Sequence, residues 1–228
     1  MAGGVPEGTT AWSTKHLAGV KQQSFEQAAQ QATVVDYLHE VEHAAERIMR
    51  LERSIDAAIE TLPRKLHAVI DALQSLRGIA KISAVSIMAE VGELSRFESA
   101  RQLMGYSGAV SREHSSGERI RRGSISKTGN AHLRRIVIES AWAYRHRPGL
   151  GATLLARQRE QSEDIKAIAW KAQHRLHGRY AKLLAKGKPK QQVITAVGRE
   201  LLGFIWAIGV AAERSHADAP RRVLKRAA

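Results

Sequence analysis

Apolar residues recur between residues 34 and 62 at alternating steps of four and three. The series is Val34, Leu38, Val41, Ala45, Ile48, Ile55, Ile59 and Leu62, and only Glu52 interrupts it. Four heptads of this kind predict one long helix that pairs with another helix. The partner is expected either in a second copy of the chain or in residues 14–32, whose composition also favours helix. Pro63 is expected to end or kink the long helix.

The same helix holds a match to a metal-binding motif. Residues 39–43 read His-Glu-Val-Glu-His, which fits the His-Glu-x-x-His pattern of zinc proteases. With Leu38 and Val41 in the apolar seam, His39 and His43 fall at outward positions, and no third ligand on another element is evident. A metalloprotease is therefore the weakest hypothesis. Residues 33–62 carry seven acids and three arginines, so we expect a scaffold or dimer arm and not a DNA-binding surface.

Helical periodicity continues through the rest of the chain, and no stretch alternates as a strand would. The expected helices are 64–76, one ending near Gly92, a short one at 100–104, one capped by Asn130, 165–184 and 191–210. We therefore predict an all-α fold, with a long coiled-coil arm followed by a helical domain. The expected divisions are a disordered start at 1–14, the arm at 15–63, a DNA-binding helical domain at 64–212 and a basic tail at 213–228.

Residues 64–92 have the pattern of a helix–hairpin–helix. A helix leads to a tight turn at Gly78 and then to a second helix rich in small residues. In such a unit the N–H groups of the turn face a DNA phosphate at the start of the second helix. The candidate contacts are Gly78 and Lys81. Turns of this type usually carry two glycines, and here Ala80 stands at the second position, so an ordinary helical hairpin is the alternative.

A loop rich in glycine, serine and arginine precedes the helix capped by Asn130. Between Arg112 and Arg147, nine lysines and arginines oppose three glutamates, which leaves net +6. Close backbone N–H groups, hydroxyls and guanidinium forks suit the binding of phosphate. A solvated basic loop is the alternative. The candidate DNA-binding residues here are Arg112, Arg119, Arg121, Arg122, Lys127, Arg134 and Arg135.

The overall charge points to the same class of partner. The 228 residues carry net +14, and the basic residues are not confined to one amphipathic helix, so DNA is favoured over an anionic membrane. The absence of cysteine excludes disulfides, thiolate metal sites and a cysteine nucleophile. No run of about 18 apolar residues suggests a membrane span, and residues 1–14 lack a signal-peptide pattern. We expect a cytoplasmic, nucleoid-associated bacterial protein with no membrane partner.

In combination, these segments resemble a known family, the DEDD insertion-sequence transposases of the "one-ten" type, also described as bridge-RNA-guided serine recombinases. The matching segments are 76–79, 90–97, 103–108, 115–117, 126–135 and 139–142, with weaker matches at 172–176 and 199–206. The resemblance covers about residues 12–209. It corresponds to the family's coiled coil and C-terminal transposase domain.

The resemblance also implies a reaction. In that family an N-terminal resolvase-like domain supplies four carboxylates that hold Mg²⁺, and a serine of the C-terminal domain attacks DNA. Carried over by motif position, the nucleophile falls on Ser116, with Ser115, Ser124 and Ser126 as rivals. A role for Ser116 only in the turn before Gly117 is the alternative. Nearby arginines are suited to stabilising charge that develops on the phosphate.

The carboxylate domain of the family is absent from this sequence. The five aspartates are Asp36, Asp56, Asp71, Asp164 and Asp218, and all fall in predicted helices or in the tail. We therefore expect no metal site or cofactor in this chain, and Mg²⁺ only together with the missing domain. The missing domain is also where much of the contact with a guide RNA is expected, so the sequence leaves guide-RNA binding open.

Two hypotheses remain. The leading one is the DNA-binding, serine-bearing C-terminal part of an insertion-sequence transposase, truncated or separately encoded, which forms a homo-oligomer through the coiled coil. The other is a non-catalytic DNA-binding module that modulates a full-length transposase.

Overall fold

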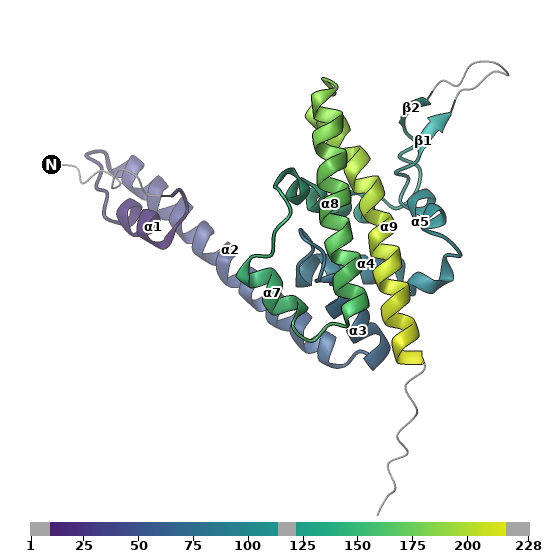
Figure 1. The fold of residues 1–228 in the computed structure, drawn as a ribbon. Coiled ribbons are helices and arrows are strands. Elements are labelled where there is room, and N and C mark those ends of the chain that lie inside the picture. Colours follow the sequence, from purple (N-terminus) through teal and green to yellow (C-terminus); the bar gives the residue numbers. More distant parts are fainter. Residues whose placement is uncertain (1–9, 114–121, 218–228) are drawn as a thin grey trace, which may run out of the picture. The chain divides into compact units, whose positions relative to one another are not determined.

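A computed structural model describes residues 10–113 and 122–217 (Figure 1). The chain divides between Thr61 and Leu62 into two compact units. The first contains α1 (Thr14–Lys21) and α2 (Ala28–Glu60). The second contains α3 (Arg64–Leu73), α4 (Lys81–Val91), the 3₁₀ helix η1 (Leu94–Arg96), α5 (Ala100–Tyr106), β1 (Ser111–Glu113), β2 (Arg122–Ile125), α6 (Ala131–Ala141), the 3₁₀ helix η2 (Trp142–Arg145), α7 (Ala152–Gln158), α8 (Glu163–Ala185) and α9 (Lys190–Ala217).

In the first unit, α1 lies beside the N-terminal half of α2 (Figure 1). An ion pair between Lys21 and Glu42 joins the two helices. The predicted helix at 14–32 is thus two helices, because the chain leaves helical geometry between Lys21 and Ala28. An intramolecular partner for the long helix was one of the two predicted alternatives. This ion pair brings α1 beside α2, and coiled-coil pairing along the seam stays a prediction.

The apolar seam of α2 is covered unevenly. Val34, Leu38 and Val41 are half-buried, whereas Ile48 is 56% exposed and Leu51 is 51% exposed. No residue of α2 is fully buried. An eight-residue α1 is too short to cover 33 residues, and Ile48 in the middle of the seam stays exposed. Further along the seam, Ile55 and Ile59 are half-buried.

The second unit is built around α9, which packs against α3, α5, α6, α8 and η1. Its buried positions recur at helical spacing, so apolar side chains face inward on most of its circumference. They include Val193, Val197, Leu201, Ile205 and Ile208, each fully inaccessible to water. The helix begins where the periodicity predicts, but it runs to Ala217 and so enters the region expected to be a tail.

By length and composition, α9 is also the one described helix that could cross a bilayer. The candidate stretch is Lys190–Ser215, and 56% of it is buried within the protein. The core helix of a water-soluble protein has the same length and composition, so the absence of a membrane partner stays a prediction.

The 3₁₀ helix η1 is fastened to α9 by a buried carboxylate. Glu213 is 2% exposed, and its two oxygens accept the N–H groups of Leu94 at 2.7 Å and Ser95 at 2.9 Å. Gly209 lies one turn earlier, where a Cβ atom would be 1.9 Å from a methyl carbon of Leu94. Only glycine allows η1 and α9 to approach so closely.

The predicted helical fold is confirmed, with one local exception. β1 and β2 pair antiparallel, with Ser111 opposite Ile125 and Glu113 opposite Arg122 (Figure 1). The expectation of no strands is therefore wrong in this loop. Strands of three and four residues are too short for an alternating pattern to be visible in the sequence. The short helix α7 was also not predicted.

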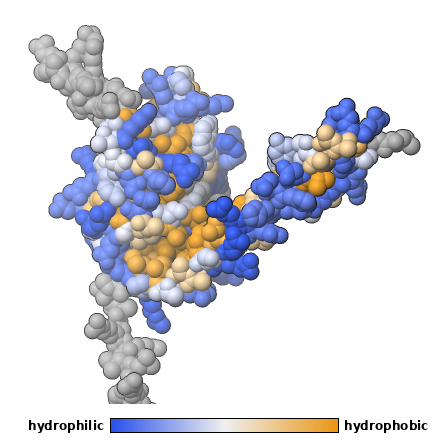
Figure 2. Space-filling view, turned by 180° about the vertical axis from the view of Figure 1, so that it is seen from behind, coloured by the Kyte–Doolittle hydropathy of each residue, from blue (hydrophilic) through white to orange (hydrophobic). Residues whose placement is uncertain are grey.

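The surface of the second unit is not uniformly polar. Ile82 is 40% exposed, Leu155 is 50% exposed and Trp170 is 43% exposed. Figure 2 shows apolar residues gathered on one face of this unit among polar surroundings. A contiguous apolar surface is typical of a contact with another macromolecule.

Candidate nucleic-acid interface

The β1–β2 hairpin is anchored at its base by backbone hydrogen bonds between the two arms. Ser126 N donates to Val110 O at 2.8 Å, and Lys127 N donates to Gly108 O at 3.1 Å. The hydroxyl of Ser126, one of the rival nucleophiles, also donates to Gly108 O at 3.3 Å. The arms are therefore held together where the hairpin joins the helices.

Two glycines make this close approach possible. Gly108 has φ +68°, and a Cβ atom there would lie 2.3 Å from Thr128 O. Gly129 has φ +119°, and its Cβ would lie 2.3 Å from Tyr106 O. Other residues rarely adopt these backbone angles and would collide with a neighbouring carbonyl. Gly108 and Gly129 therefore serve packing within the loop, and the binding of phosphate by this glycine-rich loop stays a prediction.

Asn130 joins the end of the loop to three helices. Its Oδ1 accepts the N–H of Leu133 at 2.8 Å, so the predicted cap of α6 is confirmed. Its Nδ2 donates to Glu90 Oε2 of α4 at 2.6 Å. The hydroxyl of Tyr106, at the end of α5, donates to Glu90 O at 2.9 Å. The Asn130 Nδ2 also lies 3.5 Å from that hydroxyl, so one amide side chain links the loop to α4, α5 and α6.

Arg134 and Arg135, neighbours in sequence, have different surroundings. Arg134 is half-buried, and its Nη1 donates to Ser107 O at 2.8 Å, which ties α6 to the loop. Arg135 keeps 66% of its side chain exposed, and its guanidinium lies 3.9 Å from Glu139, the predicted pair one turn along the helix. Of these two predicted DNA contacts, Arg135 is displayed to solvent, whereas Arg134 has a partner within the protein.

The turn of the predicted helix–hairpin–helix packs against α6. Gly78 has φ +84°, and a Cβ atom there would lie 2.4 Å from Ser140 O. The next residue, Ile79, is fully buried, and its carbonyl accepts a hydrogen bond from Arg157 Nη1 at 2.6 Å. Burial lowers the pKa of Arg157. Gly78 is required for the packing of helices, and DNA contact by Gly78 and Lys81 stays a prediction.

Several predicted site residues lie outside the described part of the chain. They are Ser115, Ser116, Arg119 and Arg121. Of Arg112, Arg122 and Ser124 the structure describes only the backbone, as part of β1 and β2. Lys127 is exposed at the foot of the hairpin, with φ +57°.

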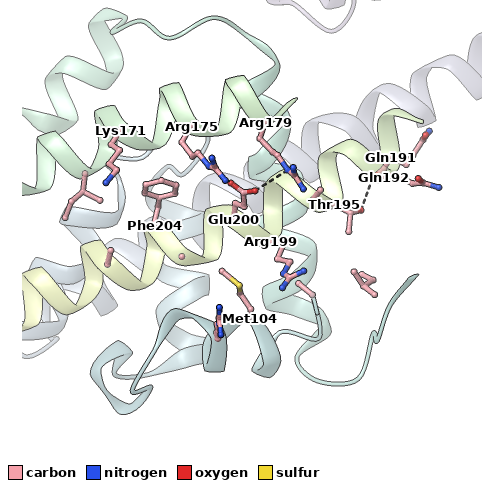
Figure 3. A pocket seen from close by; sticks show the side chains of 17 residues that line it. Met104, Lys171, Arg175, Arg179, Gln191, Gln192, Thr195, Arg199, Glu200 and Phe204 are labelled. Atoms are coloured by element: carbon pink, nitrogen blue, oxygen red, sulfur yellow. Dashed lines mark hydrogen bonds and ion pairs between the residues drawn. The ribbon is translucent and has the colours of Figure 1, made fainter. Parts of the chain in front are cut away.

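Beside the hairpin base lies a groove of about 1490 Å³ between α5, α8 and α9, which the sequence reasoning missed (Figure 3). The hairpin contributes Ala109 and Ile125 to its wall. Five cations and one acid line it, namely Arg101, Lys171, Arg175, Arg179, Arg199 and Glu200. A signal was present, because Lys171, Arg175 and Arg179 recur every four residues along one helix.

The charges of the groove are only partly balanced. Glu200 pairs with Arg175 Nε at 2.8 Å and lies 3.2 Å from Arg179 Nε. Among the described residues, Arg101, Lys171 and Arg199 have no ion-pair partner. The lining therefore carries a net positive charge that an anionic ligand would neutralise.

Comparison with known proteins agrees with the resemblance in the sequence. Residues 70–154 match the transposase family IS116/IS110/IS902. The chain is 41% identical over 208 residues to "Putative transposase y4qE" of Sinorhizobium fredii, which covers 90% of this chain and 49% of that protein. It is 31% identical over 159 residues to "Transposase for insertion sequence element IS1111A" of Coxiella burnetii, covering 67% and 38%. It is 25% identical over 170 residues to "Pilin gene-inverting protein" of Moraxella bovis, covering 74% and 45%. The chain spans about half the length, or less, of these relatives.

Proposed function

Because residues 70–154 match the IS116/IS110/IS902 transposase family, we propose that this chain is the DNA-binding, serine-bearing C-terminal part of a transposase of that family. The matched region runs from α3 into α7, and the β1–β2 hairpin lies at its centre. The observation that carries the proposal is the anchoring of that hairpin by Asn130, Arg134 and the two glycines of its base.

Anchoring matters because transfer of a phosphoryl group depends on positioning. A nucleophile must be held close to phosphorus and in line with the leaving oxygen. In the proposed reaction, Ser116 Oγ forms a bond to phosphorus, a bond from phosphorus to a sugar oxygen breaks, and that oxygen takes up a proton. The helices α4, α5 and α6 provide a base for β1 and β2, and Ser116 stands between these two strands in the sequence.

A serine hydroxyl is a weak nucleophile until a base or metal activates it. Among the described residues, no three histidine, aspartate or glutamate side chains lie close enough together to hold a metal ion. The described residues therefore do not fit the Mg²⁺ site that the family resemblance implies. In our proposal, activation of Ser116 depends on a separate carboxylate domain with its Mg²⁺.

The test is the formation of a covalent protein–DNA adduct. The purified chain is incubated with labelled DNA, alone or with Mg²⁺ and the part of the Sinorhizobium relative that this chain does not match, and the products are separated by denaturing gel electrophoresis. We expect an adduct only in the complemented reaction. Ser116→Ala should abolish it, and Ser115→Ala is the matched control. An adduct formed by the chain alone, or one that survives in Ser116→Ala, contradicts the proposal.

A non-catalytic role is the second candidate, favoured by the exposed apolar side chains near the middle of α2. Ile48 of the seam and its neighbour Leu51 are both more than half exposed, which suits pairing with the same helix of another copy or of a full-length transposase. If this candidate is right, no covalent protein–DNA adduct forms even when the carboxylate domain and Mg²⁺ are supplied. Adding this chain to a full-length transposase should then reduce transposition. We also propose self-association through α2 and contact with a guide RNA, and both properties are compatible with either candidate function.

A further inference from the structure

The groove between α5, α8 and α9 combines a basic rim with an apolar floor. Figure 3 shows Lys171, Arg175 and Arg179 along α8 with their side chains directed toward α9. The floor includes Met104 of α5, Ile168 of α8 and Phe204 of α9. Its ligand must therefore offer both negative charge and flat or apolar surface.

The three cations on α8 form a regular row. They stand four residues apart, and a helix rises 1.5 Å per residue, so successive side chains are about 6 Å apart along the axis. A row of this kind suits a ligand whose negative charges also repeat along its length. A single compact anion would engage one or two of these side chains and leave the others without a partner.

Glu200 holds two arginines of the row and leaves their terminal N–H groups accessible. Its carboxylate lies between Arg175 and Arg179 and is close to the Nε atom of each (Figure 3). A guanidinium has five N–H donors in a planar fork, so Arg175, which donates from Nε to Glu200, still presents its terminal N–H groups. Arg179 is held near Glu200 by the ion pair alone, because its Nε makes no hydrogen bond. Both arginines are thereby placed to receive phosphate oxygens.

The opposite side of the groove is also basic. Arg199 projects from α9 toward Met104 (Figure 3), and Arg101 comes from α5. Both side chains are exposed and, among the described residues, have no ion-pair partner. A ligand in the groove would therefore meet cations on both sides and the half-buried Phe204 beneath it.

We propose that this groove is a binding site for a single strand of nucleic acid. Phosphates would lie along the basic row, and an unstacked base would rest on Phe204 and Met104. Aromatic side chains under a positively charged channel are the usual means of binding single strands without sequence preference. The inference rests on the proposal that the chain acts on nucleic acid, and it assigns a second site apart from the hairpin.

A duplex fits this groove poorly. The outer surface of a double helix consists of phosphates and sugars, and its bases are stacked inside, so a concave apolar floor would stay uncovered. An acidic peptide would satisfy the cations, but the net charge of +14 and the transposase relatives favour a polynucleotide. DNA and RNA single strands share the chemistry on which this inference depends.

The test measures fluorescence anisotropy of the full chain with a labelled oligonucleotide of about ten nucleotides, as DNA, as RNA and as duplex DNA. Phe204→Leu keeps an apolar floor but removes the aromatic ring. We expect it to weaken single-strand binding about fivefold or more, with duplex binding unchanged. Phe25→Leu is the matched control, because Phe25 belongs to the first unit. The DNA and RNA arms show which strand binds more tightly.

A second pair of variants tests the charges. Each phosphate neutralised on a single strand contributes about 0.7 to the slope of log K against log salt. Arg101→Gln with Arg199→Gln should therefore lower that slope by about 1.4. Arg159→Gln is the control, because Arg159 is an exposed arginine outside the groove. It should leave single-strand affinity within about twofold of the wild type.

The inference is overturned if the groove variants leave single-strand binding unchanged, or if they weaken single-strand and duplex binding equally. A groove that instead binds an acidic peptide would show the first outcome. Failure of the proposed function would give another result. The covalent adduct would be missing, while the groove variants would still weaken the binding of single-stranded oligonucleotides.

Discussion

Exchange of Asn130 for aspartate separates its two roles. Aspartate is as good a helix cap as asparagine, so the hydrogen bond to the N–H of Leu133 should persist. The Nδ2 donor, however, becomes an oxygen that faces Glu90 Oε2, an atom 2.6 Å away in the wild type. Asn130→Asp therefore tests the contact between the loop and α4 while the cap of α6 is kept.

The cost can be worked from this contact. Losing a hydrogen bond to a charged group costs about 1.5–3 kcal/mol, and facing two like charges in water-like surroundings adds about 1 kcal/mol. The Glu90 side chain is 33% exposed, and solvent screening favours the lower part of this range. We expect a loss of about 2–3 kcal/mol, which lowers Tm by about 4–12 °C for a protein of this size.

The assay is thermal denaturation followed by circular dichroism near pH 7, beside the adduct assay. Glu90→Gln in the Asn130→Asp background restores a donor opposite the new carboxylate, and it should recover at least half of the lost stability. Asn130→Ala, which removes the cap as well, should not be rescued by Glu90→Gln. An Asn130→Asp protein that melts within about 1 °C of wild type would refute the reasoning.

Three further predictions concern other parts of the chain. Gly209→Ala places a methyl group against Leu94 and should cost about 1–3 kcal/mol, measured as a fall in the midpoint of urea denaturation; an unchanged midpoint would contradict the packing of η1 on α9. Ile48→Asp should abolish self-association measured by light scattering at tens of micromolar (an order-of-magnitude concentration), and a wild type that is monomeric there would show that α2 does not pair. Arg121→Glu with Arg122→Glu should weaken duplex binding at all sequences and reduce its salt dependence by about 0.9 per lost phosphate contact; binding insensitive to salt would oppose a role for these arginines.

Local sequence signals predicted most helices and several of their ends. Asn130 was expected to cap α6, and its Oδ1 accepts the N–H of Leu133. Pro63 was expected at the end of the long helix, and α2 ends at Glu60. These features depend on residues within one or two turns of each other, so the sequence alone contains what decides them.

The candidate site was predictable only in part. Charge and motif order placed attention on the hairpin, whose outer residues lie outside the described part of the chain. The basic groove escaped notice because its lining comes from α5, α8 and α9, which are far apart in sequence. A basic stripe such as Lys171, Arg175 and Arg179 looks like an ordinary solvated helix face until the facing helix is known.

The sequence by itself determined two things: its apolar periodicity indicated a helical chain, and its composition indicated a basic chain suited to a polyanionic partner. The tertiary structure decided which residues are available for that partner. Arg134 and Arg135 are alike in sequence, yet one donates to Ser107 O at 2.8 Å and the other remains 66% exposed. Gly78 has φ +84°, and the carbonyl oxygen of Ser140 lies only 2.4 Å from where a Cβ atom would stand, so the packing of a distant helix excludes a side chain there. A side chain's role depends on the groups that surround it, and in a folded chain most of those groups come from distant positions that no local pattern contains.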